Sequence, residues 1–203
     1  MTDIDLMALH GLVVRKAGSP AAVAAVLGAD QGEVSAALHA AVAAGHAVGR
    51  DERYMVTPAG RTWLDERYPI VYAEFRADPE ATASYDRFER INRDLLRLFT
   101  DWQMVPSPGG PVPNDHSDRD YDNGIINRLG DAHERALTSL ERFAALQPRI
   151  GVYAQRLDNA YDQVLAGDID YVSGARIDSY HTVWFELHED LLRMLGRERE
   201  EAP

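Results

Sequence analysis

The chain has 203 residues, of which 45% are hydrophobic and 27% charged, and its formal net charge is −12. This apolar fraction excludes a wholly disordered chain, and the acidity argues against a general nucleic-acid coat protein or a binder of anionic membranes. The absence of cysteine excludes disulfides, thiolate metal sites and cysteine nucleophiles. Asp3 and Asp5 stand where a secretion signal carries basic residues, and no apolar run approaches a membrane span, so we expect a cytoplasmic protein.

Five short elements are predicted in the first 68 residues. Apolar periodicity predicts a helix over 3–16, and Ser19 with Pro20 opens a second helix that ends at Gly28. A third helix is expected over 31–44. Two short strands, 46–50 and 53–57, flank the turn Asp51–Glu52 and predict a hairpin. Thr57 and Pro58 then start a fourth helix.

This order, helix, helix, turn, helix, hairpin, helix, is typical of a winged helix. The stretches "SPAAVAAVLGADQGEVSAALHAAVAAGHAV" and "RYMVTPAGRTWL" resemble winged-helix regulators of the MarR and PadR type. The resemblance covers about a third of the chain. It implies a DNA-binding domain in a protein that acts as a homodimer.

The rest of the chain is predicted to be helical. Asp78 and Pro79 open a helix that runs to about residue 103, and a Pro/Gly loop over 105–115 is expected to have no regular structure. Ser117 is the expected cap of the next helix, which Pro148 stops. A helix over 149–166, a turn over 168–174 and a last helix over 175–195 follow. Four such helices suit an antiparallel bundle.

The predicted fold class is therefore mainly α. An N-terminal winged helix-turn-helix with a small β-hairpin wing, residues 1–68, precedes a C-terminal antiparallel helical bundle, residues 72–203. The bundle would serve dimerisation, effector binding or an accessory role. Residues 71–203 carry 25 acidic and 15 basic side chains, whereas residues 1–70 carry eight and six, so the acidity lies mostly in the bundle.

Candidate DNA contacts lie on the third predicted helix and around the hairpin. Polar residues four apart on one face offer groups that can meet base edges, and nearby arginines offer phosphate contacts. The candidates are Gln31, Ser35, His39, Arg50, Arg53 and Arg61. Against DNA, Asp30 and Glu33 lie where a phosphate would sit. The alanines of the same helix, Ala36, Ala40 and Ala43, would equally suit docking on a protein.

The last helix holds the other candidate site. Asp178 and His181 have the carboxylate–histidine spacing of metal-binding bundle helices, and His181 and His188 with one carboxylate or His133 could form a mononuclear divalent-metal site. Tyr180, His181, Trp184 and His188 could instead line a small-molecule pocket. In the remaining interpretation the aromatic residues are core and the histidines are hydrogen-bonded within it. Outside the metal alternative, no cofactor is expected.

A second resemblance involves the C-terminal part. "PNDHSDRDYD", "RLGDAHERAL" and "IDSYHTVWFELHEDLL" resemble the helical tail of actinobacterial proteins related to phosphoenolpyruvate-utilising enzymes of the pyruvate phosphate dikinase group. The sequence has no Gly-rich nucleotide loop and no phosphohistidine segment, so no catalytic residue of that group has a counterpart here. This resemblance implies an accessory or sensing domain.

Three functions follow from these patterns. The first is a winged-helix transcriptional regulator that binds DNA as a dimer, with an effector site in the bundle. The second is an accessory protein linked to a phosphoenolpyruvate-utilising phosphotransfer system, with the winged helix as a docking surface and no DNA. The third is a small metalloenzyme that uses the bundle histidines.

Overall fold

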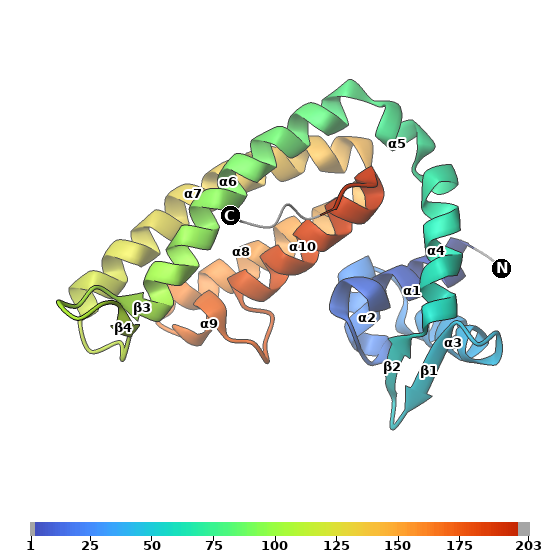
Figure 1. The fold of residues 1–203 in the computed structure, drawn as a ribbon, viewed down its shortest axis with the longest axis horizontal. Helices are drawn as coiled ribbons and strands as arrows, with labels where there is room; N and C mark the ends of the chain where they lie inside the picture. Colours follow the sequence, from blue (N-terminus) through green and yellow to red (C-terminus); the bar gives the residue numbers. More distant parts are fainter. Residues whose placement is uncertain (1–2, 199–203) are drawn as a thin grey trace. The chain divides into compact units, whose positions relative to one another are not determined.

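The structure, a computed structural model, describes residues 3–198 and is mainly helical, with two small antiparallel ladders (Figure 1). The prediction of a mainly α fold is confirmed. Two compact units are present. The hairpin unit comprises the described residues up to Pro79 together with those from Glu186 onward, and the bundle unit comprises Glu80–Phe185. The sequence patterns divided the chain into two consecutive stretches. They did not predict that the residues from Glu186 onward belong to the same unit as the N-terminal residues.

The hairpin unit contains short helices around one hairpin. Its elements are α1 (Asp3–Arg15), α2 (Pro20–Leu27), α3 (Gln31–Ala43), β1 (Ala47–Arg50), β2 (Arg53–Val56), α4 (Pro58–Val71), α5 (Ala73–Ala77) and the last part of α10 (Tyr180–Leu195). The order and approximate bounds predicted for the first 68 residues agree with these elements.

Local side-chain chemistry sets the helix boundaries in this unit. The Ser19 hydroxyl accepts the Ala22 N–H, and Gly28 ends α2 in the left-handed region. The Asp30 carboxylate accepts the N–H groups of the first turn of α3, and the Thr57 hydroxyl accepts the Gly60 N–H at the start of α4. Each cap satisfies backbone donors that a helix start leaves without a partner.

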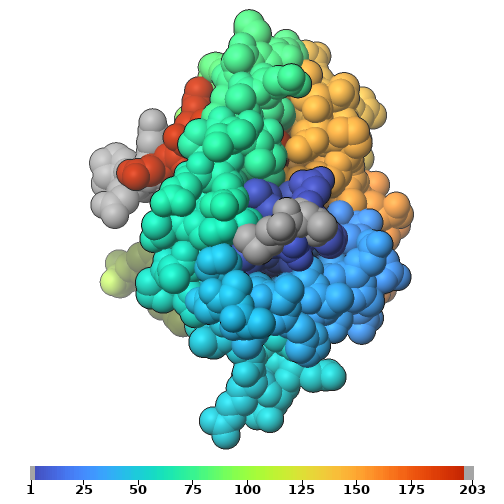
Figure 2. All heavy atoms as spheres, turned by 90° about the vertical axis from the view of Figure 1, so that its right-hand side faces the viewer, coloured from blue at the N-terminus to red at the C-terminus, as the bar shows by residue number. Residues whose placement is uncertain are grey.

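The hairpin closes through a two-residue turn. Asp51 and Glu52 both have positive φ, 50° and 57°, as a type I′ turn requires. The register pairs Arg50 with Arg53 and Val48 with Met55. In Figure 2 this hairpin, drawn in cyan, projects from the helices of its unit.

Apolar side chains from several helices form most of the core of the hairpin unit. Side chains that are 0–1% exposed come from four different helices and include Leu9, Leu12, Val23, Leu38 and Leu64. Large-to-small changes at such positions typically cost about 2–5 kcal/mol. This packing holds α3 and the hairpin in a fixed relation.

The bundle unit contains the long helices. Its elements are α6 (Pro79–Gln103), β3 (Met104–Val105), β4 (Val112–Pro113), α7 (Arg119–Leu146), a 3-10 turn (Pro148–Ile150), α8 (Gly151–Leu165), α9 (Asp170–Ser173) and the first part of α10. In Figure 1, α6, α7 and α8 lie alongside one another. Their facing sides bury a core that includes Phe88, Leu95, Leu129, Leu140 and Tyr153.

Four local predictions for this unit were wrong. Asp118, rather than Ser117, caps α7, because its carboxylate accepts the Asp120 and Tyr121 N–H groups. The Pro/Gly loop carries the ladder β3–β4, with Met104 opposite Pro113. A short helix, α9, forms within the predicted turn over 168–174. The last helix begins five residues late, at Tyr180, where the Ser179 hydroxyl accepts the Thr182 N–H.

Across residues 3–198, no helix combines the length and the apolarity needed to cross a membrane.

Candidate functional site

The polar face predicted on the third helix is present on α3. Gln31 and His39 are exposed and Ser35 is half-buried, while Val34 and Leu38 face the core. The spacing of four residues places the three polar side chains along one side of the helix. Gln31 and Ser35 are therefore available to a partner.

On that face, His39 links α3 to the hairpin. One ring nitrogen, Nδ1, lies 2.8 Å from the Ser35 carbonyl oxygen, and Nε2 lies 3.2 Å from the Tyr54 hydroxyl. The geometry assigns an Nδ1–H that donates to the carbonyl and an Nε2 that accepts from Tyr54. Because both nitrogens are engaged, His39 fixes the hairpin against α3 and is less suited to contact a base than its exposure indicates.

Two arginines face each other at the tip of the hairpin. Arg50 and Arg53 are directly paired across β1 and β2. Like charges in such positions destabilise a ladder. Arg50 Nε lies 3.5 Å from the Asp51 carboxylate, with both side chains at least 90% exposed, and a pair this exposed contributes little. The tip thus presents two solvated guanidinium groups whose repulsion a bound anion would relieve.

Arg61 adds a third cation on α4. It lies one turn into the helix and is exposed. Within residues 3–198, neither Arg53 nor Arg61 has an ion-pair partner. These two arginines are free to meet a phosphate.

The N-terminus of α3 is closed to anions. Asp30 Oδ1 accepts the Gly32 and Glu33 N–H groups at 2.8 and 3.0 Å. A helix start can bind phosphate through such N–H groups, but here a carboxylate already occupies them. The candidate phosphate contacts that remain on this unit are Arg50, Arg53 and Arg61 of the hairpin and α4.

Exposed apolar side chains border the same surface. Val48 and Met55 form a cross-strand pair and are 57% and 51% exposed. Val42 on α3 is also exposed. Alternation along the strands puts Val48 and Met55 on the same face of the hairpin as Arg50 and Arg53. That face therefore combines two cations with an apolar pair.

Contacts of Thr57 with Gly45 and Gly60 hold the base of the hairpin, and the sequence patterns did not predict them. The Thr57 hydroxyl donates to the Gly45 carbonyl at 2.7 Å and accepts from the Gly60 N–H at 3.1 Å. A Cβ at Gly60 would overlap the His46 carbonyl oxygen. This overlap explains why the "TPAG" stretch has glycine at position 60. Tyr54 also holds the hairpin in place, because it pairs with Gly18 through two backbone hydrogen bonds.

The residues proposed for a metal site have other partners. Asp178 precedes α10 and accepts from Arg156 Nε and Nη2 at 3.1 and 3.0 Å. His133 contacts Asp158 at 3.1 Å and the Tyr180 hydroxyl at 3.3 Å. His188 belongs to the hairpin unit, whereas the other three belong to the bundle unit. Among the described residues, no group of three or more histidines or carboxylates is arranged to hold a metal ion.

Burial lowers the pKa of two of these histidines. Desolvation lowers the pKa of His133 more than the Asp158 carboxylate raises it, and desolvation alone lowers the pKa of His181. The His181 ring packs edge-on against Phe99, with the ring centroids 4.7 Å apart. Burial therefore favours the neutral form of both side chains.

The aromatic residues proposed to line a pocket belong to the core. Tyr180 is 0% exposed and Trp184 is 3% exposed. The Trp184 indole stacks on Phe88 with centroids 4.6 Å apart and donates its N–H to Asn92 Oδ1 at 3.0 Å. This geometry matches the interpretation of the helix as structural.

The hairpin unit contains a buried polar network that no sequence pattern predicted. His10 and Asp190 are both 0% exposed and lie 2.9 Å apart, and the other ring nitrogen of His10 lies 3.0 Å from the Tyr68 hydroxyl. Glu186 contacts Arg15 at 3.2 Å. These pairs explain why α10 buries charged residues on its last turns.

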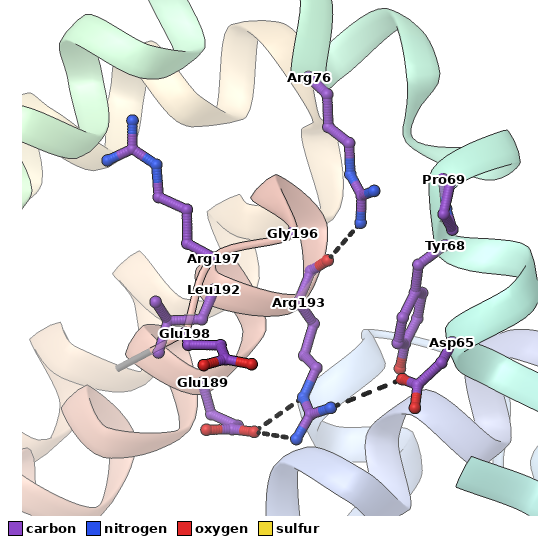
Figure 3. A pocket seen from close by; sticks show the side chains of 10 residues that line it. All are labelled: Asp65, Tyr68, Pro69, Arg76, Glu189, Leu192, Arg193, Gly196, Arg197 and Glu198. Carbon is purple, nitrogen blue, oxygen red and sulfur yellow. Dashed lines mark hydrogen bonds and ion pairs between the residues drawn. The ribbon is translucent and has the colours of Figure 1, made fainter. Parts of the chain in front are cut away.

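A hollow of about 500 Å³ lies beside this network, lined from α4, α5 and the end of α10 (Figure 3). Its cations are already engaged. Arg76 donates to the Met194 and Arg193 carbonyl oxygens at 2.7 and 3.0 Å, and Arg193 contacts Glu189 at 2.7 Å. The arginines here cap the end of α10 and tie it to its own unit.

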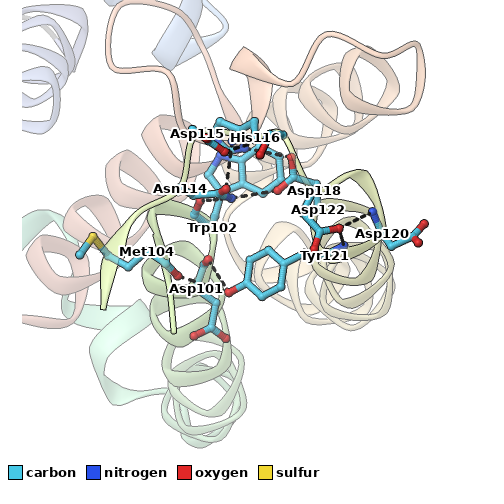
Figure 4. Close-up of polar contacts among 11 residues, drawn as sticks. Asp101, Trp102, Met104, Asn114, Asp115, His116, Asp118, Asp120, Tyr121 and Asp122 are labelled. Carbon is cyan, nitrogen blue, oxygen red and sulfur yellow. Dashed lines mark hydrogen bonds and ion pairs between the residues drawn. The ribbon is translucent and has the colours of Figure 1, made fainter. Parts of the chain in front are cut away.

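The loop before α7 is held by a second polar cluster (Figure 4). Asp122 accepts from the Asn114 side chain at 2.9 Å and lies 3.0 Å from His116 Nδ1. Asn114 also donates to the Trp102 carbonyl, and the Trp102 ring packs on His116. These contacts fix the loop on the ends of α6 and α7, which is a structural role.

No known protein family, no curated protein and no solved structure matches this chain.

Proposed function

We propose that the protein is a winged-helix regulator that binds double-stranded DNA as a homodimer. In this proposal α3 is the recognition helix and β1–β2 is the wing. The observation that carries it is the facing pair Arg50 and Arg53 at the tip of a projecting hairpin. Two arginines held opposite each other are unfavourable without an anion, because the contact of Arg50 with Asp51 is solvent-exposed and contributes little, and a duplex supplies closely spaced phosphates.

The neighbouring surface supports the same function. Gln31 and Ser35 on α3 offer groups for base edges, and Arg61 offers a further phosphate contact. The Asp30 carboxylate at the start of α3 opposes close approach of a phosphate there. We therefore expect the wing to supply most of the backbone contacts.

A salt titration tests this proposal. Fluorescence anisotropy would follow the full chain binding a duplex from the region upstream of its own gene, between about 50 and 200 mM salt. The wild type should show salt-dependent binding. Each arginine that contacts a phosphate contributes about 1 to the slope of log K against log salt, so Arg50→Gln with Arg53→Gln should flatten the slope by about 2.

A matched control keeps this test specific. Arg119 and Arg176 are exposed and lie in the bundle unit, so Arg119→Gln with Arg176→Gln removes the same charge outside the hairpin unit. This control should leave the slope unchanged. Equal loss in both double variants, or no binding by the wild type at low salt, would refute the proposal.

The apolar pair on the wing favours a second candidate function, an accessory module that docks on a protein. Val48 and Met55 are more than half exposed on the face that would meet a partner. The resemblance of the C-terminal part indicates a phosphotransfer enzyme as that partner. Recovery of such an enzyme with the wild type, its loss with Val48→Ser and Met55→Ser, and no duplex binding would favour this candidate over the first.

A further inference from the structure

An arginine-lined hollow lies between α6 and α7 in the bundle unit. Its volume is about 550 Å³, and the arginines that line it are Arg87, Arg90, Arg93, Arg135 and Arg142. Asp94 is the one acidic residue of its lining. Such a concentration of positive charge is unexpected in a chain whose formal net charge is −12.

Nearby carboxylates neutralise only part of this charge. Glu80 contacts Arg87 and lies 3.5 Å from Arg142, and Asp94 lies 2.9 Å from Arg135. Arg90 and Arg93 are exposed and have no ion-pair partner within the part of the chain that the structure describes. At least two guanidinium groups at the hollow therefore carry uncompensated charge.

The wall of the hollow also contains polar groups that lack a partner. Ser139 is 4% exposed, and its hydroxyl has no hydrogen-bond partner. The Nε–H of Arg87 is likewise buried without an acceptor. Buried groups of this kind cost free energy, and both are donors at the edge of a positively charged cavity. An anion in the hollow would satisfy them.

We propose that this hollow binds a small phosphorylated ligand that carries at least two phosphate charges. The guanidinium fork matches phosphate oxygens, and the volume lies in the range of small-molecule sites. Arg90 and Arg93 supply the charge, and the Ser139 hydroxyl donates to a ligand oxygen. The site lies wholly in the bundle unit, so it does not depend on the proposed DNA binding.

Titration calorimetry of the full chain with inorganic tripolyphosphate, at about 150 mM salt to screen exposed charges, tests the proposal. Citrate serves as the polycarboxylate comparison. The wild type should bind one tripolyphosphate per chain saturably and more tightly than citrate. Arg90→Gln with Arg93→Gln should weaken binding by at least about tenfold, because two charge-assisted contacts are lost.

Two controls locate the site. Arg119→Gln with Arg176→Gln removes equal charge elsewhere in the bundle unit and should bind tripolyphosphate as the wild type does, whereas Arg50→Gln with Arg53→Gln tests the hairpin as the alternative site. If the hairpin double variant loses binding and the Arg90/Arg93 variant retains it, the ligand binds at the hairpin and the proposal is overturned. Absence of saturable binding, or tighter binding of citrate, overturns it as well.

Ser139→Ala separates ligand binding from a structural role and does not depend on how the arginine variants fold. It removes a buried hydroxyl without a partner, so the Tm of the ligand-free protein should rise. The same change should lower tripolyphosphate affinity severalfold, and so reduce the Tm shift that the ligand produces. Unchanged affinity in Ser139→Ala would remove the serine from the site and contradict the proposal.

Discussion

Gly60 is the residue at which the structure predicts the largest effect of adding a single carbon. A Cβ there would overlap the His46 carbonyl oxygen and come within 2.9 Å of Val56 Cγ1. The obstacle is backbone, which cannot rotate away, so α4 and the hairpin base would have to separate. Overpacking typically costs about 1–3 kcal/mol, and the gain in helix propensity offsets at most about 1 kcal/mol. We expect Gly60→Ala to lower the free energy of unfolding by about 2 kcal/mol.

Gly124 is the matched control. It lies in α7, is exposed, and an added Cβ would meet nothing within 4 Å. Gly124→Ala should therefore stabilise the protein by about 0.5–1 kcal/mol. Urea denaturation followed by circular dichroism measures both changes, and hydrogen exchange should show the loss of protection in β1, β2 and α4. A Gly60→Ala protein as stable as the wild type would refute the steric argument.

Three further changes test other contacts. Asp51→Asn with Glu52→Gly should stabilise the hairpin by about 1 kcal/mol, because glycine and asparagine tolerate positive φ. Thermal denaturation measures this change, and a lower Tm would contradict the turn assignment. The pKa of His181 is lowered in the folded protein, so the unfolded chain binds more protons below pH 6.5 and stability falls on acidification. His181→Gln should reduce the fall in unfolding free energy between pH 7.5 and 5; an unchanged pH profile would disprove this. Asp190→Ala leaves His10 without its buried carboxylate and should lower the free energy of unfolding by about 3 kcal/mol, measured by urea denaturation. An unchanged urea midpoint in this variant would contradict the prediction.

The elements that the sequence predicted best are those set by local chemistry. Ser19 and Thr57, the predicted caps, accept backbone N–H groups three residues away, so a short stretch of sequence is enough to predict their effect. The turn at Asp51 and Glu52 is equally local, since strands on both sides leave only two residues for it.

The elements that were missed depend on partners distant in the chain. The α10 residues that were expected to bind a ligand or metal could not be distinguished from core residues, because their environment is made by Phe88, Asn92 and Phe99 on α6. The start of α10 was placed too early, since nothing in the sequence shows that Arg156 holds Asp178 outside the helix.

The residues proposed to contact DNA lie on α3, the hairpin and α4 as the sequence placed them, and their binding of DNA stays a prediction; the contact of His39 with Tyr54 was not predicted. The spacing of His39 from Gln31 and Ser35 indicated a base contact, whereas the Tyr54 hydroxyl engages its Nε2. The arginine hollow was not predicted because its lining comes from two helices. Arg90 and Arg93 carry no sequence motif, and the structure places Arg135, Arg142 and Ser139 of α7 in the same lining.

The contact between His10 and Asp190 also has a consequence for the order of events during synthesis. The two residues are 180 positions apart, and a ribosome that adds about 5–20 residues per second needs roughly 10–40 s to cover that distance. Throughout this interval the nascent hairpin unit lacks the carboxylate that its buried histidine meets in the finished protein. The hairpin β1–β2 and α3 should therefore reach their final stability only after Asp190 has been synthesised.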